Sequence, residues 1–133
     1  MSTTTSWPGD WLRGVLEMAV LRVLADEPAS YGYAITLSLE AQGFGQVKGG
    51  TMYPLLSRLE DAGHVMTHWQ PGDGGPGRKY YTITPTGREH LERSVASWCR
   101  FAGSTVTFLR HGTHGIPNVS TPTDASGMPS PTA

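Results

Sequence analysis

The first third of the chain carries apolar residues at helical spacing. From Trp11 onward every third or fourth residue is apolar, which predicts one helix with a single buried face. That helix should stop at Asp26, because Pro28 follows closely and the residue before a proline is pushed out of the helical region. Ser30 is a favourable N-cap, so a second helix is predicted to begin there and to end near Gly43.

A third helix is predicted between Gly50 and Gly63. Its closing glycine is typical of a helix C-cap. Pro54 would normally break a helix, but we expect it in the first turn, where a missing N–H has no partner to lose. The expected buried face consists of Met52, Leu55, Leu56, Leu59 and Ala62.

Two strands are predicted after the third helix. Residues 65–69 and 79–83 alternate apolar and polar side chains, as half-buried strands do. The eight residues from Gln70 to Gly77 are rich in Gly and Pro, so they should form a protruding hairpin loop. Arg78 and Lys79 directly follow this loop and would make its end cationic.

A long fourth helix is predicted from residue 84 to residue 111. Thr84 fits the N-cap position and Pro85 the first helical position. The apolar face is too long for a three-helix core to cover, so we expect it to bury itself against a second copy of the chain. The expected dimerisation residues are Leu91, Val95, Trp98, Ala102, Val106 and Leu109.

Together these elements predict a mainly α (α+β) fold, a winged helix-turn-helix followed by a long C-terminal helix. The expected divisions are a flexible arm (1–10), the winged helix-turn-helix (11–83), the dimerisation helix (84–111) and a disordered tail (112–133). The tail prediction follows from its Pro, Ser, Thr and Gly content, because such residues bury too little apolar surface to offset the entropy of ordering.

Composition narrows the classes of function. A chain of 133 residues fits one domain, and its single cysteine, Cys99, excludes an intramolecular disulfide. No apolar run approaches the roughly 20 residues that span a bilayer, and no signal peptide is visible. We therefore expect a cytoplasmic protein without membrane contact, which as a DNA binder would be associated with the nucleoid.

Charge is distributed unevenly, although the formal net charge is only −1. Residues 1–45 hold two basic and five acidic side chains, whereas residues 46–110 hold eight basic and five acidic ones. The half with the third helix and the hairpin is therefore positive, which suits contact with a phosphate backbone. The alternative is ordinary charge scatter.

Residues 11–110 resemble the PadR family of transcriptional regulators, in its compact subclass with a single C-terminal helix. Five motifs in the same order carry the resemblance and make it specific. They are Leu12-Arg13-Gly14-Val15-Leu16-Glu17, Tyr31-Gly32-Tyr33-Ala34-Ile35, Gly50-Thr51-Met52-Tyr53-Pro54-Leu55-Leu56, Arg78-Lys79-Tyr80-Tyr81 and Thr82-Ile83-Thr84-Pro85-Thr86-Gly87-Arg88. Tyr31 departs from the pattern, since many relatives have His there. The resemblance implies a homodimer that represses transcription and leaves its operator when a small effector binds.

The third helix is expected to enter the major groove of double-stranded DNA, and Arg78 and Lys79 of the hairpin to follow the phosphates or the minor groove. For Tyr33 and Tyr53, phosphate contact is what the resemblance implies. Few long polar side chains leave the third helix, so DNA shape should contribute to specificity. Each basic residue has an ordinary solvated charge as its alternative, above all Arg58, which is close to Glu60 in sequence. The candidate DNA-binding residues are Tyr33, Lys48, Gly50, Thr51, Tyr53, Pro54, Arg58, Arg78, Lys79 and Tyr80.

The resemblance also implies an effector site. In multidrug-sensing relatives a Trp at the position of Trp98 pairs with its symmetry mate and stacks a flat aromatic compound. Trp11, Val15 and Phe101 would line the same cavity. The alternative for Trp98 is plain interface packing. Cys99, beside a basic residue, is either a redox sensor or a small buried hydrophobe.

The sequence offers little support for an enzymatic function. The sequence has no order of Ser, His and Asp typical of a triad, no P-loop and no dinucleotide fingerprint. His64 and His68 would share one face of a strand, but no third residue completes a metal site. We expect no enzymatic activity, no metal and no cofactor. The competing hypothesis is a winged-helix module that contacts proteins or sequesters drugs without specific DNA binding.

Overall fold

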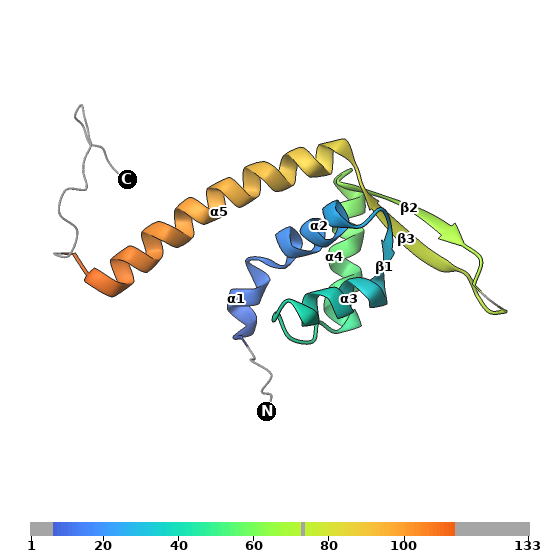
Figure 1. Ribbon diagram of the computed structural model, residues 1–133, viewed down its shortest axis with the longest axis horizontal. Helices are drawn as coiled ribbons and strands as arrows, with labels where there is room; N and C mark the ends of the chain where they lie inside the picture. The colour runs from blue at the N-terminus through green and yellow to red at the C-terminus, as the bar shows by residue number, and fades with distance from the viewer. Residues whose placement is uncertain (1–6, 73, 114–133) are drawn as a thin grey trace. The chain divides into compact units, whose positions relative to one another are not determined.

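The computed structural model describes residues 7–72 and 74–113 (Figure 1), so most of the expected arm and tail lies outside it. The elements, in chain order, are α1 (Gly9–Arg13), α2 (Leu16–Asp26), β1 (Ser30–Tyr31), α3 (Gly32–Ala41), α4 (Gly49–Asp61), β2 (Val65–Gln70), β3 (Arg78–Ile83) and α5 (Pro85–His111). The predicted fold class is confirmed, with α2, α3 and α4 as the three helices and the β2–β3 hairpin, hereafter the wing, after them.

The core lies where α2, α3 and α4 meet one face of the sheet. Each helix turns its apolar stripe inward, because residues three and four apart share a helix face. Leu91 is only 3% exposed, so the first part of α5 belongs to the same core. The largest fully buried side chains are Val20, Leu21, Leu24, Ile35, Leu39, Met52, Leu56 and Leu59.

The sheet is antiparallel and has β3 as its central strand, between β1 and β2. Trp69 stands opposite Lys79 in the register, and Thr67 opposite Tyr81. Because successive side chains alternate between faces, these four residues share the face that leads into the core. Arg78 lies on the opposite, outer face. The wing strands are one residue longer than predicted at their outer ends, so Arg78 is part of β3.

The first predicted helix is divided in two. α1 ends at Arg13, and the chain turns at Gly14 and Val15 before α2 begins. The amides of Gly14 and Val15 donate to the carbonyls of Trp11 and Leu12, three residues back, as in a tight turn. Glycine disfavours a helix interior by about 1 kcal/mol relative to alanine, which accounts for the break. The prediction of one continuous helix was therefore wrong.

Two further local predictions need correction. Ser30 does not cap a helix; it is buried and pairs with Tyr81 in the sheet, while Tyr31 occupies the N-cap without a side-chain hydrogen bond. Pro54 is the sixth residue of α4, beyond the first turn, because the helix begins at Gly49. Its missing N–H therefore leaves the carbonyl of Gly50 without the usual helical donor.

The junction between the wing and α5 is confirmed as predicted at Thr84. Its hydroxyl accepts the amide hydrogen of Gly87 at 2.9 Å, which caps α5, and donates to the carbonyl of Gly63 at 2.7 Å. The Thr84 amide donates to the His64 carbonyl at 3.0 Å. These bonds fix the start of α5 to the turn between α4 and β2.

Two compact units divide within α5, after Val95. The first unit contains the winged helix and the buried Leu91. In the second unit, Trp98, Val106 and Leu109 are exposed and Ala102 is half-buried. The predicted helical spacing of these apolar residues is thus realised on a continuous helix.

Candidate nucleic-acid interface

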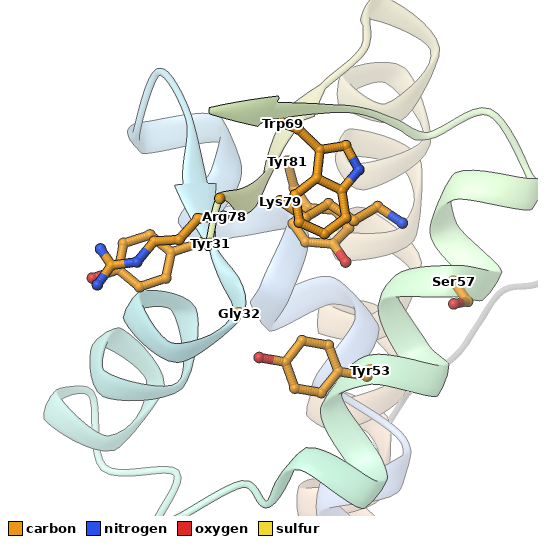
Figure 2. A pocket seen from close by; sticks show the side chains of 9 residues that line it. Tyr31, Gly32, Tyr53, Ser57, Trp69, Arg78, Lys79 and Tyr81 are labelled. Atoms are coloured by element: carbon orange, nitrogen blue, oxygen red, sulfur yellow. The ribbon is translucent and has the colours of Figure 1, made fainter. Parts of the chain in front are cut away.

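A groove of about 410 Å³ lies between α4, the amino end of α3 and the wing. Figure 2 shows Tyr53 and Ser57 reaching it from α4, with Trp69 and Lys79 on the wing side. Its lining residues are Tyr31, Gly32, Tyr53, Ser57, Trp69, Gly77, Arg78, Lys79 and Tyr81. The groove thus brings Tyr53 of α4 together with two consecutive wing residues, Arg78 and Lys79, that lie far from it in sequence.

Tyr53 is held in this groove by close contact with a glycine. A Cβ atom added to Gly32 would lie 2.5 Å from the Tyr53 hydroxyl oxygen, so the ring occupies the space of the missing side chain. The ring is still half exposed. Tyr53 therefore presents its hydroxyl beside the amino end of α3, where backbone amides favour an anion.

Arg78 stacks on an aromatic cluster on the outer face of the sheet. Its Cζ atom lies 4.4 Å from the centre of the Tyr31 ring, within the range of a cation–π contact. Tyr80 contacts Tyr31 edge to face at 5.4 Å, and the His68 ring stacks on Tyr80 at 5.8 Å. In the described ranges no carboxylate is within 4.0 Å of the Arg78 guanidinium, so its charge is uncompensated.

Lys79 is partly neutralised by Glu60. Its Nζ atom lies 3.5 Å from Glu60 Oε1, while the Thr67 hydroxyl donates to Glu60 Oε2 at 2.9 Å. Burial raises the pKa of the neighbouring Tyr81, and the negative charge of Glu60 raises it further. Lys79 therefore lines the groove as one half of an ion pair, which no sequence pattern predicted.

Arg58 also forms an ion pair, but with a residue of another helix. Its Nε atom lies 3.5 Å from Glu17 Oε2 on α2, whereas the sequence suggested Glu60 or Asp61 as the neighbouring acids. Glu60 instead pairs with Lys79. Both partners of the Arg58 pair are well exposed, so the attraction is screened by water and weak.

Four of the remaining candidates lie at the amino ends of α3 and α4, and Pro54 lies further along α4. Lys48 is the N-cap of α4, and its carbonyl accepts the amide hydrogen of Thr51. The first amides of a helix have no intrahelical partner, so they remain available to a phosphate. The exposed candidates here are Tyr33, Lys48, Gly50, Thr51 and Pro54.

Trp69 is a lining residue that the sequence analysis did not single out. It lies at the outer end of β2 and is 69% exposed. The available signal was the phase of the strand: Val65, Thr67 and Trp69 share one face, and only the last lies beyond the reach of the core.

The four expected effector-pocket residues belong to different units of the chain. Trp11 and Val15 lie in the first unit, and Trp98 and Phe101 in the second. Trp7, which the sequence analysis left in the arm, lies 6.3 Å from Trp11 between ring centres. Cys99 is exposed, so within this chain it is not a buried hydrophobe.

The two histidines considered for a metal site do not share a strand face. His64 precedes β2 and stacks on His90 of α5, with ring centres 4.1 Å apart. Its Nδ1 atom is buried without a hydrogen-bond partner. Burial lowers the pKa of His64, and the positive charge of His90 lowers it further, while Glu17 acts in the opposite direction.

In the described part of the chain, the His, Cys, Asp and Glu side chains form no group of three or more that would hold a metal ion. None of the helices in this part combines the length and the apolar character that crossing a bilayer requires.

Several known proteins with similar sequence or structure are named as transcriptional regulators. A PadR family transcriptional regulator from Eggerthella lenta is 34% identical with a TM-score of 0.69, covering 75% of this chain and 86% of its own. A transcriptional regulator from Mycobacterium tuberculosis is 33% identical over 82 residues, which are 62% of this chain and 74% of that protein. Bacillus subtilis PadR, solved in complex with operator DNA, is 28% identical with a TM-score of 0.56, covering 61% of this chain and 45% of that one.

A family profile gives the decisive match. The profile described as "Transcriptional regulator PadR-like family" matches residues 20–93, more than half of the chain. This span contains α3, α4 and the wing, and with them the whole groove. The chain belongs to the PadR-like family of transcriptional regulators.

Proposed function

We propose that this regulator is a homodimeric repressor, which an aromatic effector releases from a pseudo-palindromic operator. The observation that carries the proposal is the groove between α4 and the wing, which Tyr53 and Lys79 line, with the Arg78 guanidinium on the outer face of the same wing. A groove bordered by a helix and a cationic hairpin suits a duplex whose major groove takes the helix. The complex of Bacillus subtilis PadR with operator DNA supports the same choice of partner.

In this proposal the contacts divide into two kinds. Thr51 and Arg58 on α4 reach the major groove, although Arg58 must first leave Glu17. Arg78 contacts the phosphates from the wing, while Tyr80 holds Tyr31 beneath it. Backbone contacts set the position of the protein, and base contacts select the sequence. The other proposed backbone-contacting residues are Tyr33, Lys48, Gly50, Tyr53, Pro54 and Lys79.

The proposed dimer forms through the apolar side of α5. Large apolar side chains recur on this helix after Val95, and Leu109 is 73% exposed. A surface of this kind is costly to leave in water and typical of protein contacts. Leu91 packs in the core of its own chain, so the proposed interface rests mainly on Val95, Trp98, Ala102, Val106 and Leu109.

The proposed effector is a flat aromatic compound that stacks on Trp98. Phe101, one turn away on α5, is also exposed and adds a second aromatic surface. Trp11 and Val15 are the other proposed contacts. An effector bound at the dimer contact would release DNA by favouring a distance between the two winged helices that differs from the distance between the operator half-sites.

The test is affinity selection of the purified chain on a random double-stranded DNA library at low salt. Enrichment of one pseudo-palindrome, with half-sites about one helical turn apart, is the expected result. Binding should then weaken by about a thousandfold or more between low and moderate salt, as phosphate contacts require. No enrichment would refute the regulator proposal in favour of a protein-contacting or drug-sequestering module.

A further inference from the structure

Trp69 occupies an unusual place in the sheet. On the same face of the sheet Val65 is 3% and Tyr81 5% exposed, and Thr67 and Lys79 are half-buried, whereas Trp69 itself is 69% exposed. The strand is fully paired at this point, since Trp69 stands opposite Lys79. The fold therefore fixes the backbone that carries this large aromatic ring without using the ring for the core.

The surroundings of Trp69 indicate what covers it. It lines the groove together with Tyr53 of α4 and the cationic Lys79, while the Arg78 guanidinium stacks on Tyr31 on the other face of the wing (Figure 2). The carboxylate nearest to Lys79, that of Glu60, is already engaged by Lys79 and by the Thr67 hydroxyl. A partner that is anionic along its length and has apolar parts between its charges fits this lining.

We infer that Trp69 packs on a deoxyribose of the DNA strand that runs between α4 and the wing. This inference rests on the proposed function. If α4 lies in the major groove, the strand bordering that groove passes between the helix and the wing. The deoxyribose offers C–H groups to the ring face, and the indole Nε1–H donates to an adjacent phosphate oxygen.

The role of Trp69 differs physically from that of Arg78. A cation that neutralises a phosphate releases a counterion, so its contribution to affinity falls with salt. An aromatic ring on a sugar buries apolar surface and releases no counterion, so its contribution is nearly independent of salt. Two variants can therefore separate these roles on one DNA fragment.

The experiment measures the affinity of the full chain for its selected DNA at four salt concentrations, by fluorescence anisotropy of labelled DNA. Trp69→Ala should weaken binding about tenfold at every salt concentration, with the slope of log affinity against log salt unchanged. Trp69→Phe should recover part of the loss, because the ring remains and the donor is removed. Arg78→Ala should instead reduce the slope by about two units, because the proposed dimer carries two Arg78 side chains.

Met66→Ala is the matched control. Met66 lies on the same strand, is 59% exposed and faces the opposite side of the sheet, so its loss should leave the affinity unchanged. Thermal unfolding of each variant checks that the fold survives. Trp69→Ala binding like the wild type, or a changed salt slope, would overturn the inference while leaving the regulator proposal intact. A wild type that binds no DNA would overturn both.

Discussion

Gly87→Ala tests the junction that fixes α5 to the winged helix. An added Cβ atom would lie 2.1 Å from the His64 carbonyl oxygen and 2.9 Å from Ile83 Cγ1. An ordinary contact begins near 3.4 Å, so the atom overlaps the carbonyl by more than 1 Å. The oxygen belongs to the backbone and also accepts the Thr84 amide hydrogen, so it cannot move without breaking that bond.

The cost of this substitution follows from three contributions. Overpacking costs about 1–3 kcal/mol, and disturbing the Thr84 bond adds about 1 kcal/mol. Alanine is better than glycine within a helix by about 1 kcal/mol, which offsets part of the loss. We expect a net loss of about 1–3 kcal/mol, which corresponds to a fall in Tm of roughly 5–20 °C for a domain of this size.

Urea unfolding followed by circular dichroism, at one protein concentration for all variants, measures the free energy. Gly103→Ala is the control within the same helix, because among the described residues no atom outside the adjoining helix backbone lies within 4 Å of its added Cβ. That variant should be as stable as the wild type or more stable by up to about 1 kcal/mol. Equal stability of the two alanine variants would refute the assignment of Gly87 to a close backbone contact.

Glu60→Gln should strengthen DNA binding and steepen its salt dependence, because it frees the Lys79 charge; titrations of labelled DNA at several salt concentrations measure both. Trp98→Ala should abolish the quenching of tryptophan fluorescence by a planar acridine dye, while sedimentation still shows a dimer. Loss of the dimer would instead assign Trp98 to interface packing. The free energy of unfolding should fall as the pH drops below about 6.5, because the pKa of His64 is lowered in the folded chain and the unfolded chain binds the proton more readily. His64→Gln should reduce this pH dependence, and an unchanged urea midpoint between pH 7.5 and 5.5 in the wild type would contradict the reasoning.

The sequence predicted those parts of the fold that depend on local patterns. The alternation of residues 65–69 placed the wing strand, and Thr84 was identified as a cap because its hydroxyl bonds a residue only three positions later. In such cases donor and acceptor are near each other in the chain. The motif of α4 and the order of the elements were recognisable for the same reason.

Features that depend on distant residues were not predictable. Ser30 has the composition of a cap, but its partner in the sheet is Tyr81, far along the chain. Lys79 and Arg78 are adjacent in sequence, yet only Lys79 has Glu60 as a partner. The packing of α4 against β2 brings this carboxylate to Lys79. Trp69 fits the alternating pattern of a strand, but its exposure depends on how far the core extends along the sheet.

The nearly neutral net charge of the chain is compatible with DNA binding because the fold separates the basic residues into two groups. Arg58 and Lys79 are paired with carboxylates at 3.5 Å, whereas Lys48 and Arg78 have none within ion-pair distance among residues 7–72 and 74–113. Exposed pairs of this kind contribute only about 0–1 kcal/mol, so a phosphate can replace either carboxylate at small cost.

The salt dependence of binding shows whether DNA phosphates replace Glu17 and Glu60 as partners of Arg58 and Lys79. In the proposed dimer, two uncompensated cations on each chain would give a slope of about −4 in log affinity against log salt. If phosphates also displace Glu17 and Glu60, four cations on each chain take part and the slope approaches about −7. A slope near −4 would mean that the ion pairs persist on DNA and that Lys79 is kept from the backbone by Glu60. The acidic partner of a basic residue would then set how strongly the wing holds DNA of any sequence.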